Sequence, residues 1–322
     1  MADSLMAAFS YVNMDNVMLD IVLLDGGLGQ EISLRYTGQT HALWSITVML
    51  EEPEIVLAVH RDFIKAGAKV LTLNTYTATP TRMAMHGYED HFEEVHKTAI
   101  KIANDAIAAS AIARQDITIA GCLPPLVASY VHECAHDYDK SLDEFRRITA
   151  LQKDHVDVFF IETMTNWEEA RAAITAAREV GKPVYASFTL NDDASNQLRS
   201  GERLEWVVEQ MAAHTPDGVM INCSYPEAVS AAMPILQKSG LMFGGYANGF
   251  TSIKEMQPGQ TVDELTARTD LPPTKYAEYA MAWIETGAQI IGGCCEIGPS
   301  HIAAITDYCH REGIVTTKHL VP

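Results

Sequence analysis

The chain has 322 residues, of which 48% are hydrophobic and 20% charged, and these globular proportions exclude a disordered or fibrous protein. No run of about 18 residues lacks polar or charged breaks, so we expect no membrane-spanning helix. The 42 acidic residues outnumber the 23 basic ones and give a net charge of -19. Such a surface repels phosphate groups, which argues against nucleic acid and anionic membranes as partners.

The first 18 residues are predicted to form a tail outside the folded unit. Asp3 stands where a secretory signal carries basic residues, and the apolar stretch after it is too short for such a signal. The six cysteines are too few to make a disulfide scaffold in a chain of this length. We therefore expect a cytoplasmic protein, in which clustered thiols serve first as metal ligands or catalytic groups. The oligomeric state is left open.

From residue 19 onward, short apolar runs alternate with longer segments of helical spacing. The clearest helices are predicted at residues 54–66, 92–113 and 276–286. Eight apolar runs have the continuous character of strands that are buried on both faces of a parallel sheet. They are residues 21–25, 70–74, 117–122, 158–162, 183–189, 218–223, 242–248 and 290–295.

This alternation predicts an α/β fold in which residues 19–322 form a single (β/α)8 barrel of the TIM type. Eight strand and helix units in about 290 residues fit a closed barrel better than an open doubly wound sheet. Reactive residues of such barrels lie at the C-terminal ends of the strands. Polar or thiol residues do end these runs, although part of this pattern is expected of any barrel; they include Asp25, Asn74, Cys122, Glu162, Asn222, Cys223, Asn248, Cys294 and Cys295.

Three cysteines stand at the ends of two of the predicted strands. Cys223 ends the sixth run and Cys294 and Cys295 end the eighth, so all three can reach one point above a barrel. Adjacent residues of a regular strand face opposite ways, and the strand must therefore break here, as Gly292 and Gly293 permit. Three thiolates suit zinc and leave one coordination position open, as in catalytic sites. The alternative is that these are buried apolar cysteines.

These residues resemble the zinc-dependent homocysteine S-methyltransferases. That family includes the enzymes that use S-methylmethionine, S-adenosylmethionine or betaine, and the homocysteine module of cobalamin-dependent methionine synthase. The resemblance covers residues 23–307 and is most specific in Ile221-Asn222-Cys223 and in Gly292-Gly293-Cys294-Cys295. Other matching segments are 24–29, 43–45, 60–63, 66–68, 74–76, 120–122 and 162–163. The implied activity is methylation of homocysteine to methionine, a step of methionine biosynthesis.

The resemblance also implies roles for individual residues. Its zinc ligands correspond to Cys223, Cys294 and Cys295. Glu162 matches the acid that holds the homocysteine amino group, Asp25 matches an acid close to the substrate, and Asn222 is implied as a positioning residue beside a ligand. The residues themselves leave two alternatives open, because Asp25 could form a turn before two glycines and Glu162 could form a structural salt bridge.

The chemistry of a thiol substrate agrees with this assignment. A metal-bound thiol is deprotonated, so we expect the homocysteine sulfur to attack the methyl group of an onium donor, with the protein supplying in-line positioning. S-methylmethionine or S-adenosylmethionine is favoured as the small cationic methyl donor. Trp44 and Tyr76 are candidates to bind it, because aromatic faces attract cations. Ordinary loop packing is the alternative for both.

Cys122 departs from the family pattern, since Gly121-Cys122-Leu123-Pro124-Pro125 replaces a small, polar sequence. Cys122 could be a spare thiol beside the site or a packing residue, and we favour packing. Other functions also stay open: a betaine- or corrinoid-linked thiol methyltransferase, and a non-catalytic zinc or redox-sensing barrel. Glu162 and Asp25 argue against a pure sensor, because a sensor has no need of an anchor for an amino group.

Overall fold

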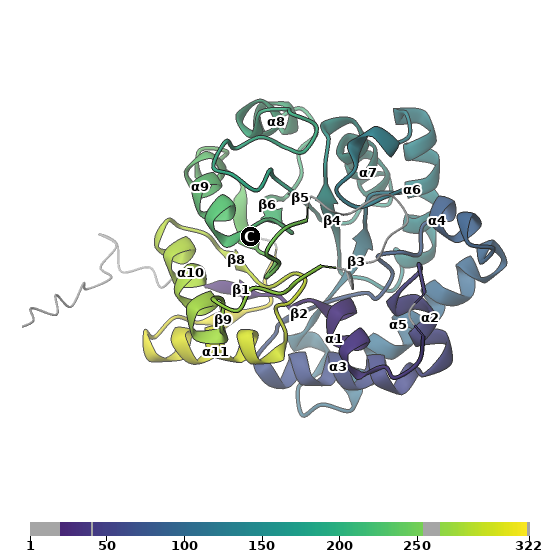
Figure 1. Cartoon of the computed structure of the whole chain (residues 1–322), viewed down its shortest axis with the longest axis horizontal. Coiled ribbons are helices and arrows are strands. Elements are labelled where there is room, and N and C mark those ends of the chain that lie inside the picture. The colour runs from purple at the N-terminus through teal and green to yellow at the C-terminus, as the bar shows by residue number, and fades with distance from the viewer. Residues whose placement is uncertain (1–19, 40, 254–264, 321–322) are drawn as a thin grey trace, which may run out of the picture.

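The computed structural model describes residues 20–39, 41–253 and 265–320, so the predicted N-terminal tail lies outside the described residues. The fold is α/β, with a curled parallel sheet at the centre and helices arranged around its outside (Figure 1). The sheet order is β2-β3-β4-β5-β6-β7-β8-β1-β9, and each neighbouring pair is parallel.

The eight predicted strand runs are confirmed, because each overlaps one of the strands β1 to β8. The strands are β1 (Ile21–Leu23), β2 (Val70–Thr72), β3 (Thr118–Leu123), β4 (Val158–Met164), β5 (Val184–Phe188), β6 (Gly218–Asn222), β7 (Met242–Tyr246), β8 (Ile290–Ile291) and β9 (Thr316–Thr317).

The three predicted helices are also confirmed, as α3, α5 and α10, although α5 ends earlier than predicted. The α-helices are α1 (Leu28–Arg35), α2 (Ser45–Glu51), α3 (Pro53–Ala66), α4 (Pro80–Met85), α5 (Phe92–Ala108), α6 (Tyr138–Gln152), α7 (Trp167–Glu179), α8 (Leu204–Met211), α9 (Pro226–Gln237), α10 (Pro273–Glu285) and α11 (Pro299–Arg311). Short 3-10 turns are η1 (Glu89–His91), η2 (Arg114–Asp116) and η3 (His132–Cys134). None of the helices within the described ranges is long and apolar enough to cross a membrane.

The prediction of a closed eight-stranded barrel is confirmed only in part. Among the described residues the sheet has nine strands, because β9 pairs with β1 through Thr316 and Thr317. A single bridge between Leu24 and Val70 joins β1 to β2 in place of a continuous ladder. The backbone N–H of Asp25 also donates to the Val70 carbonyl at 3.1 Å. The physical reason is that β9 pairs with β1 at Ile21 and Val22, which leaves only the end of β1 at Leu24 to reach β2.

The core has two layers, one on each face of the sheet, which explains the continuous apolar runs. In β4, Phe159 and Ile161 pack in the outer layer against the helices, whereas Phe160 belongs to the inner layer. This alternation follows from the two-residue period of a strand. The inner layer includes Val22, Leu24, Val70, Ala120, Val158, Tyr185, Met220, Tyr246 and Ile290, and it forms the floor beneath the strand ends.

Candidate functional site

One cavity at the C-terminal ends of the strands brings together all the residues that the sequence predicts for the site. Its volume is about 140 Å³. The predicted residues that line it are Asp25, Trp44, Tyr76, Glu162, Asn222, Cys223, Cys294 and Cys295. They come from the ends of β1, β4, β6 and β8 and from the loops after β1 and β2, so distant parts of the chain build one site.

The three predicted metal ligands converge as expected. The Sγ atoms of Cys223, Cys294 and Cys295 all lie within 4.8 Å of one another. Strand β8 ends at Ile291, so the two adjacent cysteines stand in the turn after the strand and not within it. Gly293 permits this turn, because a side chain at that position would collide with the side chain of Ile297.

Two of these three cysteines are joined, since Cys223 and Cys294 form a disulfide with their Cα atoms 5.6 Å apart. Sulfur atoms that converge on one point to hold a metal are also within bonding reach of one another, so this pair is compatible with the predicted ligand set. In the reduced state the residues fit a zinc ion, because Zn–S bonds of about 2.3 Å in a tetrahedral site place the sulfurs roughly 3.8 Å apart. The three sulfurs lie within 4.8 Å of one another, and the joined pair would have to part on reduction to reach that geometry.

Two buried carboxylates face the same cavity. Asp25 accepts hydrogen bonds from the Thr72 backbone N–H at 2.8 Å and from the Thr72 hydroxyl at 3.2 Å. Burial raises the pKa of Asp25 to about 8, and the nearby charge of Glu162 contributes in the same direction. Burial also raises the pKa of Glu162, which accepts from the Cys122 thiol at 3.0 Å and the Tyr246 hydroxyl at 3.1 Å.

Within the described residues, neither Asp25 nor Glu162 forms an ion pair with a lysine or arginine. The structural salt bridge considered for Glu162 is therefore absent from this part of the chain. Two neighbouring buried acids without a protein cation are costly to ionise. A cationic group of a ligand would remove that cost.

Asn222 holds the backbone next to Glu162. Its Oδ1 accepts from the Thr163 N–H at 2.8 Å, and its Nδ2 donates to the Thr163 hydroxyl at 2.9 Å. The φ angle of Thr163 is positive, at 60°. Three other residues that line the cavity also have a positive φ: Trp44 at 53°, Tyr130 at 67° and Cys223 at 47°. Such left-handed backbone is strained in residues other than glycine, and its concentration here is typical of a functional site.

The two aromatic candidates differ in their surroundings. Trp44 packs against the sulfur cluster, and its indole N–H is buried without a hydrogen-bond partner among the described residues. Tyr76 hydrogen-bonds with the Ser129 hydroxyl at 3.0 Å, and the Arg82 guanidinium lies 5.4 Å from its ring centre. A guanidinium on that face disfavours a second cation there. Trp44 is therefore the better placed of the two to meet a cationic donor.

Sequence analysis missed two contacts of the site. The Tyr130 hydroxyl donates to the sulfur of Cys223 at 3.1 Å, and the Arg199 guanidinium lies 5.1 Å from the Tyr130 ring centre. Both interpretations of Cys122 find support, because the residue is buried, yet it also lines the cavity and its thiol donates a hydrogen bond to Glu162. The position of Cys122 at a strand end was the available signal, whereas Tyr130 lies in a loop without any motif.

We expect Tyr130→Phe to weaken metal binding by about 10- to 100-fold, the usual cost of losing a partner that orients a metal ligand. Affinity is measured by competition with a chelator in reduced protein. Tyr138→Phe is a matched control, because Tyr138 also has an arginine over its ring (Arg171, 3.8 Å) but donates to Thr175. Equal affinities of Tyr130→Phe and the wild type would contradict this role.

The fold and the site define a class of protein: an α/β enzyme scaffold that places three cysteines and two buried acids at the ends of parallel strands. Residues 22–309 match the family described as homocysteine S-methyltransferase, and the chain belongs to that family of methyltransferases. The homocysteine S-methyltransferase of Escherichia coli (strain K12) is 29% identical over 303 residues, covering 89% of this chain and 94% of that relative.

Solved structures agree with this assignment. The metallated form of the Escherichia coli homocysteine methyltransferase MmuM matches with a TM-score of 0.74, and the oxidised form matches with a TM-score of 0.75. Each is 27% identical to this chain, and each match covers 90% of this chain and 96% of the other. The backbone of this protein is thus similar to both a metallated and an oxidised relative.

Proposed function

We propose that this protein transfers a methyl group from a sulfonium or other onium donor to the thiol of L-homocysteine, giving methionine. The observation that supports this most directly is the pair of buried acids, Asp25 and Glu162, in the cavity where three cysteine sulfurs converge. A thiol amino acid matches both features, with its ammonium group at the acids and its sulfur at the cysteines. A zinc ion held by Cys223, Cys294 and Cys295 would keep the substrate thiol deprotonated near neutral pH.

The residues of the chain supply binding and orientation. Asp25 and Glu162 hold the homocysteine ammonium, and Asn222 keeps the backbone beside Glu162 in place through Thr163. Trp44 contacts the cationic donor, and Tyr76 contributes to the wall of the cavity. In the transfer, the homocysteine sulfur forms a bond to the methyl carbon while the bond from the donor atom breaks and leaves its electron pair on that atom. In-line positioning of the two substrates is the main catalytic contribution of the protein.

We also infer that residues 19–322 act as one barrel domain of the TIM type, because backbone hydrogen bonds join β1 to β2 despite the lack of a ladder. The Lys69 N–H donates to the Leu23 carbonyl at 2.7 Å, and the Asp25 N–H to the Val70 carbonyl. A reducing compartment such as the cytoplasm suits a site that needs three thiolates.

The test combines metal analysis with a donor screen on protein prepared under reductant. We expect about one zinc per chain and methionine formation from L-homocysteine with S-methylmethionine or S-adenosylmethionine. Turnover with betaine alone would favour the betaine-linked alternative. The contrary outcome is a protein that binds zinc but shows no turnover with any of these donors and none with a methyl-corrinoid. That result would overturn the proposed activity and favour a non-catalytic zinc or redox-sensing protein.

A further inference from the structure

Arg82 is a buried cation in the wall of the cavity. The residue is 9% exposed and lies on α4. Its Nη2 donates to the Pro125 carbonyl at 2.8 Å and lies 3.4 Å from the Ser129 hydroxyl. Its Nε is buried and has no hydrogen-bond partner among the described residues. Part of the hydrogen-bonding capacity of this guanidinium is therefore unused.

Arg82 also lacks an acidic partner at ion-pair distance within the described part of the chain. The nearest carboxylate influence comes from Glu169, whose Oε1 accepts from the Leu126 N–H at 2.8 Å instead. Burial lowers the pKa of Arg82, yet a guanidinium stays charged in proteins. A buried charge without an acidic partner is costly, so we expect a function for this arginine beyond its contacts with Pro125, Ser129 and the Tyr76 ring.

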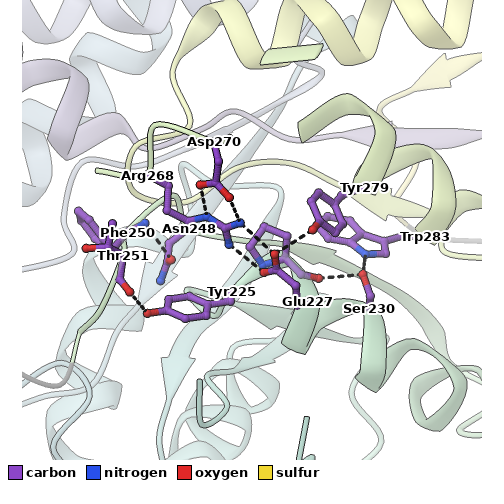
Figure 2. A network of polar contacts seen from close by, with 11 residues as sticks. Tyr225, Glu227, Ser230, Asn248, Phe250, Thr251, Arg268, Asp270, Tyr279 and Trp283 are labelled. Carbon is purple, nitrogen blue, oxygen red and sulfur yellow. Dashed lines mark hydrogen bonds and ion pairs between the residues drawn. The ribbon is translucent and has the colours of Figure 1, made fainter. Parts of the chain in front are cut away.

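Arg268 differs from Arg82, because its guanidinium is paired with carboxylates of the protein (Figure 2). Arg268 is half-buried, and Glu227 at 2.8 Å and Asp270 at 2.9 Å both pair with it. This network joins residues 268–270 to α9. Arg268 is thus neutralised by the protein, whereas Arg82 is not.

We propose that Arg82 binds the carboxylate of an amino-acid substrate in this cavity; this inference rests on the proposed function and names the substrate class. Asp25 and Glu162 then match the ammonium group and Arg82 matches the carboxylate, so the cavity is complementary to a zwitterion. Homocysteine and an amino-acid sulfonium donor both carry such a carboxylate. Arginine is suited to this task because its planar fork binds carboxylates in a bidentate manner.

The first test measures the binding of ligands that do not react. L-methionine and L-methioninamide differ only in the carboxylate, and calorimetry on the reduced, zinc-loaded protein compares their affinities. We expect the wild type to prefer L-methionine by about 10- to 100-fold, the range for a hydrogen bond to a charged group. Arg82→Gln should reduce this preference to about twofold or less, and Arg82→Lys should restore part of it.

Arg268→Gln serves as the control for the general loss of a guanidinium that makes structural contacts. It should lower the melting temperature but leave the preference for L-methionine over the amide unchanged. An unchanged preference in Arg82→Gln, or an equal loss of preference in both variants, would overturn the inference. If the wild type binds the two ligands equally, the inference fails while the proposed function stands. If the wild type neither binds L-methionine nor methylates homocysteine, both fail.

Kinetics with truncated substrates identify which carboxylate Arg82 contacts. The acceptor is compared with 3-aminopropane-1-thiol and the S-methylmethionine donor with (3-aminopropyl)dimethylsulfonium, each of which lacks only the carboxylate. Loss of discrimination by Arg82→Gln in the acceptor series assigns the contact to homocysteine, and loss in the donor series assigns it to the donor. Discrimination that persists in both series would contradict the inference.

Discussion

Cys223→Ala is expected to abolish stoichiometric zinc binding and to lower kcat/KM for homocysteine by more than about 100-fold. Loss of a partner that merely orients a ligand costs about 10- to 100-fold in affinity or activity, and loss of a ligand itself should cost more. Cys223 is supplied by the end of β6, so its removal leaves only the adjacent pair on the other side of the cluster. Metal analysis and initial rates under reductant provide the measurement.

A thiol titration on the same samples tests the oxidised state. The chain has six cysteines, and the Cys223–Cys294 disulfide removes two of them, so the oxidised wild type should show four thiols on denaturation without reductant. Cys134→Ala is the control, because Cys134 lies on η3 outside the cavity and should leave zinc content unchanged. Wild-type zinc content and activity in Cys223→Ala would exclude the three-cysteine site.

The strands and the main site residues could be predicted because they follow one simple physical rule. Strands of a parallel sheet are buried on both faces and therefore appear as continuous apolar runs. The residue that ends such a run stands at the edge where ligands bind. Asp25, Glu162 and Cys223 are found by this rule alone, and the structure places all three in one cavity.

Features that depend on packing between loops could not be predicted. Arg82 lies in a short segment without a motif, and Pro125 and Ser129, which contact its guanidinium, come from another loop. Strand β9 consists of two threonines, too short and too polar to give a periodic signal. Sequence analysis predicts that the sulfurs of Cys223 and Cys294 approach one another, but not that they are joined, because the same convergence suits a metal site and a disulfide.

Asp25→Asn is expected to stabilise the ligand-free protein at pH 8 and above while weakening homocysteine binding by about 10- to 100-fold. An unfolded aspartate has a pKa near 3.9, whereas burial raises the pKa of Asp25 to about 8 in the folded state. Between these values the folded protein binds one proton more than the unfolded chain. The stability of the wild type therefore falls as the pH rises through this window.

The asparagine side chain preserves the local geometry of this position. Its carbonyl oxygen can accept from the Thr72 N–H, and its amide can donate to the Thr72 hydroxyl, so both present contacts keep a partner. The difference between the melting temperatures of the variant and the wild type should grow as the pH rises toward 8. Above that pH the difference should remain constant. Asp105→Asn, at an exposed position of α5, should show no such divergence. If Asp25→Asn gains stability at high pH but binds homocysteine as the wild type does, the buried charge serves another purpose, and Glu162 alone holds the ammonium group.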